Sequence, residues 1–226
     1  MPFDWERVFG RVAPRILDVG CGLGHFVIEA AAADPGRDYL GIESVGPLVE
    51  QASREAVRRG LANARFVAAD AAAWLSSDAA PGSLDEIHVY HPQPYYDPGQ
   101  VPLELLSRDF FERAWTVLRP GGLLVLQTDN RRYGKHLLEA VANGFEPSIQ
   151  EGPWPDAPLG RTAREIMARR KGLPILRILA RRRERPLERP APAPYFNPAR
   201  PGLRRRRLNR KKAASQRGPG GHAIIE

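Results

Sequence analysis

Short apolar runs alternate with amphipathic stretches along the first 130 residues of the chain. Runs with the composition of strands are found at residues 15–20, 38–43, 64–70, 84–91 and 122–129. Stretches with the apolar spacing of helices lie between them, at residues 22–33, 47–59, 71–75 and 109–118. Strands that alternate with helices predict a parallel sheet, and right-handed crossovers place helices on both of its faces. We therefore expect an α/β fold with a doubly wound, mostly parallel sheet and a ligand crevice at the carboxyl ends of the strands.

The last third of the sequence has a different character. Residues 161–170 have a helical pattern, and the apolar run at 173–180 predicts a last strand or helix. From Arg181 onward proline, glycine and arginine dominate and large apolar side chains are few, which is typical of a segment that is disordered in isolation. The sequence thus predicts one domain at residues 1–180 and a basic Pro/Arg-rich tail at residues 181–226.

The net charge of +8 is distributed unevenly along the chain. Residues 1–150 hold 14 Lys/Arg and 20 Asp/Glu, whereas residues 151–226 hold 20 Lys/Arg and 6 Asp/Glu. An acidic body with a basic extension is typical of a catalytic domain that carries a polyanion-binding segment. A basic tail that only aids solubility, or that binds nucleic acid without specificity, would have the same composition.

Composition excludes several other classes of protein. Hydrophobic residues (42%) and charged residues (27%) have globular proportions, and no apolar run approaches the roughly 20 residues of a membrane span. The first residues carry acids and lack the apolar core of a signal peptide, so we expect a cytoplasmic protein. The single cysteine, Cys21, excludes internal disulfides and argues against a structural zinc site. His88 and His91 would face opposite sides of a strand, so no metal is expected.

The first strand leads into a glycine-rich turn, ILDVGCGLG at residues 16–24. Asp18, Gly20, Gly22 and Gly24 give it the pattern D-x-G-x-G-x-G. Glycines allow a tight turn and a close approach of the backbone to a ligand, where any Cβ would intrude. The pattern therefore predicts a cofactor site at this turn.

Acidic residues end the next two strands. Glu43 closes the second strand, where a carboxylate can accept hydrogen bonds from both ribose hydroxyls of an adenosine. Asp70 closes the third strand and, with Ala71, is placed to bind the adenine edge. A dinucleotide site would have the spacing G-x-G-x-x-G, and Asp18 would repel its pyrophosphate but attract the sulfonium and amino groups of S-adenosylmethionine. We therefore predict S-adenosylmethionine as the cofactor, with a dinucleotide as the alternative.

Further motifs follow in order along the chain. They are GIE at 41–43, DA at 70–71, SLDEIHVYHPQP at 83–94, RDFF at 108–111, LRPGGLLVLQTDNRRY at 118–133 and T-x-x-E at 162–165. Together with the glycine turn, they make the chain, from its first strand to about residue 172, resemble the bacterial tRNA (guanine-N7-)-methyltransferases. The resemblance implies a Rossmann-like methyltransferase fold and transfer of a methyl group from S-adenosylmethionine to N7 of a guanine in the variable loop of tRNA.

One motif departs from the family pattern. The family has phenylalanine-proline-aspartate-proline-tryptophan after the fourth strand, and this chain has HPQPY at 91–95, so Gln93 stands where the family has an acid regarded as catalytic. N7 carries a lone pair and no proton, so its methylation needs alignment and charge stabilisation rather than a general base. Gln93 can orient the base by hydrogen bonds, and the nearby Asp129 can supply negative charge. We predict these two residues as catalytic, the lost carboxylate costing about 1–3 kcal/mol of transition-state stabilisation.

The resemblance also implies residues that contact the substrate. Thr162 and Glu165 lie three apart on one face of a predicted helix that, in the family, closes over the cofactor and the guanine. Arg161 is placed to hold a phosphate and Tyr95 to stack on an extruded guanine, and Asp129 completes this predicted set. An exposed charged helix and a loop that covers the sheet edge are the structural alternatives for these positions.

The sequence thus predicts an S-adenosylmethionine-dependent methyltransferase that modifies N7 of a guanine in tRNA. The glutamine at position 93 leaves open a methyltransferase that acts on another RNA or on a small molecule. A non-catalytic RNA-binding protein on a methyltransferase scaffold is a further alternative, against which the three acids argue, because a scaffold does not need them. A monomer and a homodimer are both compatible with the sequence.

Overall fold

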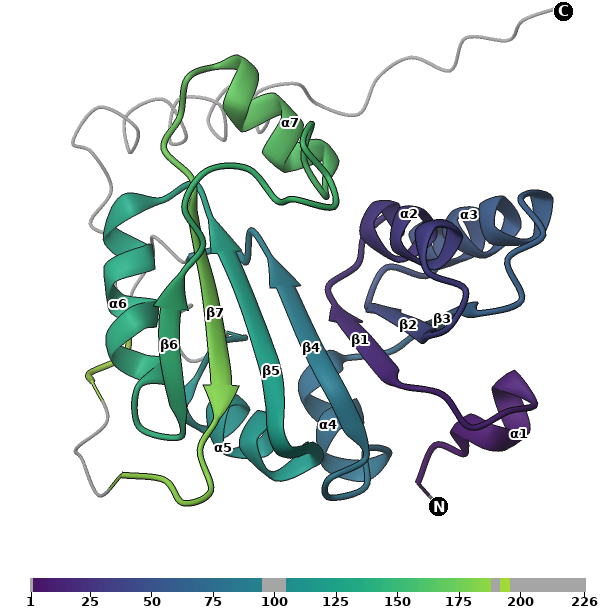
Figure 1. The fold of residues 1–226 in the computed structure, drawn as a ribbon, viewed down its shortest axis with the longest axis horizontal. Coiled ribbons are helices and arrows are strands. Elements are labelled where there is room, and N and C mark those ends of the chain that lie inside the picture. The colour runs from purple at the N-terminus through teal and green to yellow at the C-terminus, as the bar shows by residue number, and fades with distance from the viewer. Residues whose placement is uncertain (1, 95–104, 188–191, 196–226) are drawn as a thin grey trace, which may run out of the picture.

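The computed structural model describes residues 2–94, 105–187 and 192–195. These residues form an α/β fold around one seven-stranded sheet of order β3-β2-β1-β4-β5-β7-β6. Figure 1 shows the strands side by side, with α7 on the side of the carboxyl ends of β4 and β5. The predicted fold class is confirmed.

The sheet combines a parallel part with an antiparallel edge. Its strands are β1 (Arg15–Val19), β2 (Asp38–Glu43), β3 (Ala64–Ala68), β4 (Leu84–Tyr90), β5 (Leu118–Thr128), β6 (Phe145–Ile149) and β7 (Leu176–Arg182). Adjacent strands among β1 to β5 are parallel, so their carboxyl ends lie along one edge. β7 is antiparallel to both β5 and β6.

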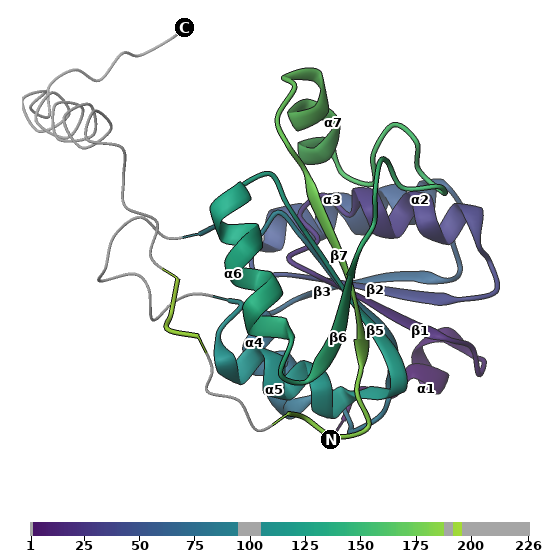
Figure 2. The same ribbon diagram turned by 60° about the vertical axis from the view of Figure 1, so that its left-hand side comes forward.

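Helices cover both faces of the sheet. They are α1 (Trp5–Phe9), α2 (His25–Ala33), α3 (Gly46–Arg58), α4 (Ala71–Ser77), α5 (Arg108–Val117), α6 (Arg131–Val141) and α7 (Ala163–Arg170). α2 and α3 lie on one face and α4, α5 and α6 on the other (Figure 2). Alternation along β1 explains the two cores: Ile16 packs with Phe26 in the smaller core, and Leu17 belongs to the larger one with Phe110 and Leu137.

Some element boundaries differ from the prediction. The helix expected from residue 22 begins only at His25, because Gly22 and Gly24 have left-handed backbones that an α-helix does not contain. β5 begins at Leu118 rather than at residue 122. α1, α6 and β6 are three further elements that the pattern of apolar residues does not predict.

Residues 176–180 of the apolar run at 173–180 belong to a strand, β7, rather than to a helix. β7 continues to Arg182, so the domain boundary predicted after residue 180 falls inside a strand. Backbone hydrogen bonds from Arg183 to the Gly144 carbonyl (3.0 Å) and from Leu187 to the Asn143 carbonyl (2.8 Å) attach the following residues to the turn before β6. Most of the predicted basic tail, residues 188–191 and 196–226, lies outside the described residues.

Candidate functional site

The turn after β1 places left-handed glycines beside the end of β2. Gly20, Gly22 and Gly24 have φ angles of 74°, 55° and 73°, a region that residues with a side chain rarely adopt. The backbone N–H groups of Gly20 and Cys21 donate to the Ile42 carbonyl at 2.8 and 3.0 Å. The turn predicted from the glycine pattern is therefore present, and it is fixed against the neighbouring strand.

Glu43, the last residue of β2, supports this turn with its carboxylate. Its Oε2 accepts a hydrogen bond from the backbone N–H of Gly22 at 3.1 Å. Its Oε1 accepts from the backbone N–H of Val45 at 3.1 Å and from the Ser44 hydroxyl at 3.2 Å. A carboxylate has about four acceptor sites, so capacity remains for a ligand's hydroxyl groups.

A cavity of about 1020 Å³ opens at the carboxyl ends of β2 and β3. Gly20, Glu43, Asp70 and Ala71, four of the predicted cofactor-binding residues, line it together. Asp70 also caps α4, because its side chain accepts a hydrogen bond from the backbone N–H of Ala73 at 2.9 Å. The cavity continues along α4 and α5, which makes it large enough for a nucleoside and more.

Asp18 lies in β1 just before the glycine turn and is only 3% exposed. Burial, and secondarily the Glu43 carboxylate, raise the pKa of Asp18 to about 8. No group in the described ranges donates a hydrogen bond to this carboxylate. With this pKa Asp18 is mainly a neutral acid at pH 7, and a cationic ligand group beside it would favour its ionised form. Burial, together with the two acids, also raises the pKa of the Cys21 thiol, which stays protonated and is a poor nucleophile.

At the carboxyl end of β5, Asp129 is held by two partners. Arg164 of α7 donates two hydrogen bonds to Oδ2, at 2.6 and 3.0 Å, and His91 Nδ1 lies 3.4 Å from Oδ1. Burial raises the pKa of Asp129, but the hydrogen bonds and charges of its partners, Arg164 foremost, outweigh burial and lower it. Asp129 is therefore an anion at neutral pH.

Thr162 and Glu165 order the start of α7. Thr162 Oγ1 accepts from the backbone N–H of Glu165 at 3.1 Å, and Glu165 Oε2 accepts from the backbone N–H of Arg161 at 2.8 Å. The Glu165 side chain is fully buried, and its Oε1 accepts two hydrogen bonds from Arg177, at 2.6 and 3.1 Å. This pattern is close to a capping box, so both side chains have structural partners, and their contact with substrate stays a prediction.

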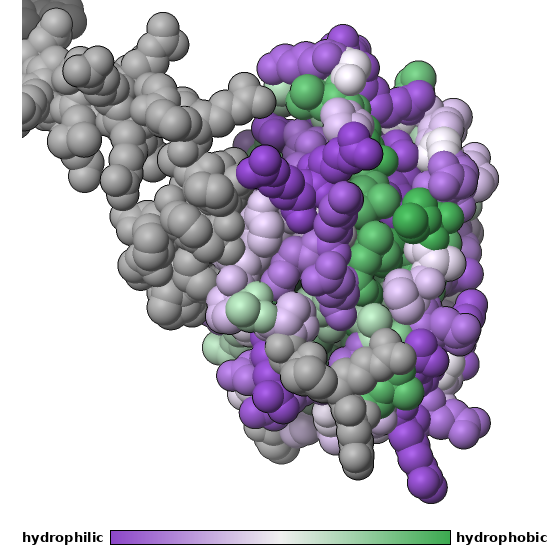
Figure 3. All heavy atoms as spheres, turned by 90° about the vertical axis from the view of Figure 1, so that its left-hand side faces the viewer, coloured by the Kyte–Doolittle hydropathy of each residue, from purple (hydrophilic) through white to green (hydrophobic). Residues whose placement is uncertain are grey.

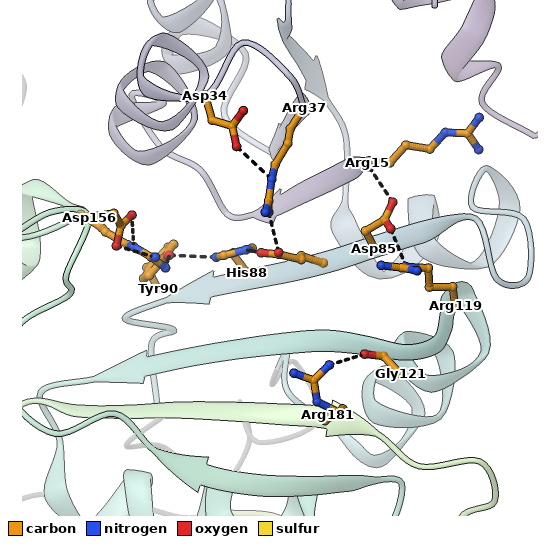
Figure 4. A network of polar contacts seen from close by, with 12 residues as sticks. Arg15, Asp34, Arg37, Asp85, His88, Tyr90, Arg119, Gly121, Asp156 and Arg181 are labelled. Atoms are coloured by element: carbon orange, nitrogen blue, oxygen red, sulfur yellow. Dashed lines mark hydrogen bonds and ion pairs between the residues drawn. The ribbon is translucent and has the colours of Figure 1, made fainter. Parts of the chain in front are cut away.

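Arg161 attaches the segment before α7 to the end of β4. Its guanidinium carbon lies 4.0 Å from the centroid of the Trp154 ring, and the group donates to Asp156 and to the Tyr90 hydroxyl, the latter at 2.9 Å. The Tyr90 hydroxyl is also 2.9 Å from His88 Nδ1, and Figure 4 shows Tyr90 between His88 and Asp156. Because Arg161 can only donate, the Tyr90 proton is available to His88. Phosphate binding by Arg161 stays a prediction.

The loop after β4 holds the other predicted residues. Gln93 is exposed, and its Nε2 donates to the Pro94 carbonyl at 3.1 Å. Tyr95 lies outside the described residues. Of the two residues predicted as catalytic, Asp129 is thus fixed by its neighbours, whereas Gln93 projects from a loop.

Sequence reasoning missed a set of buried polar residues at this edge. The Trp154 indole donates to Gln127 Oε1 at 2.6 Å, and Gln127 Nε2 lies 2.8 Å from His91 Nε2. The pairs are 27 and 36 positions apart, so no local spacing brings them together. A glutamine within the apolar run LLVLQT was the single signal in the sequence, because a buried amide requires partners.

Fold and site together define a methyltransferase of the α/β class. Residues 12–178 match the model of a family described as a putative methyltransferase. The chain belongs to this methyltransferase family, as its similarity to curated members over most of its length also shows.

Its relatives include the tRNA (guanine-N(7)-)-methyltransferase of Alkalilimnicola ehrlichii, which is 36% identical over 190 residues, 82% of this chain and 79% of the relative. The enzyme of the same name from Chromobacterium violaceum is 39% identical over 141 residues, 62% of each chain. The chain thus spans four fifths of the first relative and just under two thirds of the second.

Solved structures show the same fold. The 16S rRNA methyltransferase KamB matches with a TM-score of 0.57 at 17% identity, over 81% of this chain and 95% of KamB. The aminoglycoside resistance methyltransferase NpmB1 matches with a TM-score of 0.51 at 19% identity, over 77% of this chain and 91% of NpmB1.

The described part of the chain contains neither a candidate membrane span nor a candidate metal site. No helix there has the length and hydropathy of a membrane span. The described side chains likewise contain no group of three or more His, Cys, Asp or Glu that could hold a metal ion.

Proposed function

We propose that the chain transfers the methyl group of S-adenosylmethionine to N7 of a guanine in tRNA. The observation that carries this proposal is the arrangement along one sheet edge. The cavity with four of the predicted cofactor residues lies at the ends of β2 and β3, and the Asp129 anion lies at the end of β5. Relatives that carry the name of this activity support the assignment of the substrate.

The residues around the cavity fit the cofactor. Gly20 presents backbone without a Cβ, and Glu43 keeps acceptor capacity for the ribose hydroxyls. Asp18 does not line the cavity but is buried in β1 just before the glycine turn, where a cationic amino group would favour its ionised form. Asp70 and Ala71 line the part of the cavity assigned to adenine. When bound, S-adenosylmethionine supplies an electrophilic methyl group on a positively charged sulfur.

The substrate side requires little proton chemistry. The N7 lone pair forms the new bond to carbon, the carbon–sulfur bond breaks, and positive charge appears on the purine. The protein therefore has to align the base, exclude water and stabilise that charge. In this proposal Asp129 stabilises the charge, because it is anionic, and Gln93 orients the base through hydrogen bonds.

Arg164 has to leave Asp129 before a base can use both carboxylate oxygens. The Arg164 side chain is 57% exposed and so accessible to an RNA phosphate, whereas the Asp129 side chain is only 11% exposed. An RNA phosphate can therefore draw Arg164 away and free Oδ2 for the polar edge of guanine. Arg161, Thr162, Glu165 and Tyr95 complete the substrate contacts in this proposal.

Exposed cations support the binding of RNA. They lie in the first turns of α6 and at the end of α7, and are Arg131, Arg132, Lys135, Arg170 and Lys171. The space-filling view of the α6 side shows hydrophilic side chains over much of this face (Figure 3). Cations at such a surface contact phosphates, and the tRNA substrate would place the activity in the cytoplasm.

Methyl transfer to unmodified tRNA tests the proposal. The purified chain is incubated with S-adenosylmethionine labelled in the methyl group, and the product is digested and mapped by mass spectrometry. We expect 7-methylguanosine in the variable loop. Asp129→Asn should lower kcat by roughly 10- to 100-fold, because a charge-stabilising group is lost, whereas the exposed Glu139→Gln should leave it unchanged. If the protein binds S-adenosylmethionine but transfers no label to tRNA, the proposal that tRNA is the substrate is wrong.

A methyltransferase with another substrate is the second candidate. The exposed amide of Gln93, at a position where the related motif has an acid, favours it. Gln93→Asp discriminates between the two. A large gain of activity on tRNA indicates a weakened tRNA enzyme, and no change indicates a different substrate.

A further inference from the structure

His91 has an unusual backbone and no role in the reaction proposed above. Its φ of 52° makes it the single non-glycine residue with a positive φ in the described ranges. Its backbone N–H donates to the Gln127 carbonyl at 2.7 Å, and its side chain is only 6% exposed. A residue held in a disfavoured conformation beside a candidate site points to a function for its side chain.

The hydrogen bonds around His91 determine which ring nitrogen carries the proton. The Trp154 indole can only donate, so the atom of Gln127 that faces it at 2.6 Å is the oxygen. The amide nitrogen of Gln127 then faces His91 Nε2 at 2.8 Å, and it too can only donate. His91 Nε2 is therefore an acceptor, and the ring proton is on Nδ1. That proton points to Asp129 Oδ1 at 3.4 Å.

The charges around the ring agree with a neutral imidazole. Burial lowers the pKa of His91, and the carboxylates of Asp129 and Glu165 oppose that effect only in part, while Arg164 adds to it. Trp154 and Gln127 are almost fully buried, so water does not compete for this chain of hydrogen bonds.

This arrangement excludes His91 as a general base. Its only acceptor nitrogen, Nε2, is occupied by Gln127, and guanine N7 has no proton to give up. What the ring does contribute is a donor that is fixed in direction and remains beside Asp129 Oδ1 when Arg164 leaves Oδ2.

We propose that His91 is a positioning residue for Asp129, held in place by Gln127 and Trp154. The inference rests on the function proposed above. In it, the hydrogen bonds from Trp154 through Gln127 and His91 fix the orientation of the Asp129 carboxylate, which faces the methylated purine. Trp154 belongs to the segment before α7. The series of hydrogen bonds from Trp154 through Gln127 and His91 therefore couples the position of that segment to the orientation of Asp129.

Kinetics of variants at position 91 give the first test. His91→Phe removes the donor at similar size, and we expect kcat to fall roughly 10- to 100-fold with little change in the KM for tRNA or the affinity for S-adenosylmethionine. His91→Asn keeps a donor and tolerates the left-handed backbone, so it should restore part of kcat. His136→Phe on α6 is the matched control. An unchanged kcat in a folded His91→Phe protein would overturn the proposal.

Nitrogen-15 NMR of the histidine rings gives a second test that needs no activity. We expect His91 to carry its proton on Nδ1 at pH 7, and Asp129→Asn to shift its resonances. Gln127→Glu places a carboxylate against Nε2, so the ring should become doubly protonated at pH 7. A proton on Nε2 in the unmodified chain would refute the proposal. Absence of tRNA methylation with the expected NMR result would instead refute the proposed function and leave the hydrogen-bond chain established.

Discussion

At the scale of single residues, Asp18 makes the stability of the protein depend on pH. Asp18 has a raised pKa because it is buried next to Glu43 and accepts no hydrogen bond from the described residues. Its contribution to stability is fully present below pH 3.8, the usual pKa, and is lost as the pH rises to about 8. Ionisation of Asp18 above neutral pH therefore costs stability.

Asp18→Asn should therefore have opposite effects on stability and on binding. At pH 7.5 we expect the ligand-free variant to be more stable by on the order of 2 kcal/mol, with less loss of stability between pH 5 and pH 8. The affinity for S-adenosylmethionine should fall, because the carboxylate is lost. Denaturant unfolding and calorimetric titration measure the two quantities.

Asp38→Asn is the matched control for this prediction. Asp38 is also buried, but Arg11 donates to it at 2.7 and 2.9 Å, so the same substitution should destabilise the protein and leave cofactor binding intact. A loss of stability in Asp18→Asn as well would contradict the interpretation.

Gly24 should be the most sensitive glycine of the turn. It combines a φ of 73° with a position where a Cβ would lie 2.5 Å from the Phe66 ring. Gly24→Ala should cost more than the roughly 1 kcal/mol of left-handed strain alone, and it should weaken cofactor binding. Gly82 has a φ of 65°, and a Cβ there would meet no other atom, so Gly82→Ala should lower the free energy of unfolding only by the cost of the left-handed backbone. If the two variants lose the same free energy of unfolding, close packing against Phe66 is not the reason for the glycine at position 24.

At the scale of elements, α7 depends on its first turn. The Thr162 hydroxyl caps the helix, and Arg164, two residues further on, reaches Asp129. Thr162→Ala should destabilise the helix start by about 1 kcal/mol and speed amide exchange in α7, whereas Thr162→Ser should not. We expect tRNA methylation to fall while cofactor affinity is unchanged. Unaltered exchange in Thr162→Ala would show that the cap is dispensable.

The elements differ in how far the sequence predicted them. The five parallel strands were predicted because each contains a short group of apolar residues and alternates with a helical pattern, although β4 also carries Asp85, Glu86 and His88. β6 was missed because it is a short edge strand, FEPSI, whose Pro147 cannot donate to a ladder. β7 could not be distinguished from a helix, because its antiparallel partners lie far away in sequence. The hydrogen-bond chain of His91 escaped prediction for the same reason.

At the scale of the whole molecule, the net positive charge comes from a single segment of the chain. Residues 196–226 contain nine Lys/Arg and one Asp/Glu, and the remaining residues contain 25 of each kind. All of the net charge of +8 therefore belongs to this C-terminal segment. It follows that the long-range attraction of a polyanion depends on residues 196–226 rather than on residues 1–195, which have no net charge.

Deletion of residues 196–226 should weaken tRNA binding and flatten its salt dependence. Each phosphate contact contributes about 0.7–0.9 to the slope of log K against log salt, so we expect a slope shallower by on the order of three units or more. Cofactor affinity should be unchanged. Filter binding at several salt concentrations measures the slope, and an identical slope in the shortened chain would show that the segment does not contact RNA.

The antiparallel edge of the sheet has a consequence for how this protein can change over evolution. Ile149, the last residue of β6, is the register partner of Ile178, and the chain re-enters the sheet at Leu176, so it leaves and returns at nearly the same place. Residues 150–175, which include Trp154 and α7, are thus an insertion into a β-hairpin. Such a segment can be lengthened, shortened or exchanged without altering the pairing of any strand. This segment can therefore diverge while β2 and β3, the strands at whose carboxyl ends the cavity opens, are inherited unchanged.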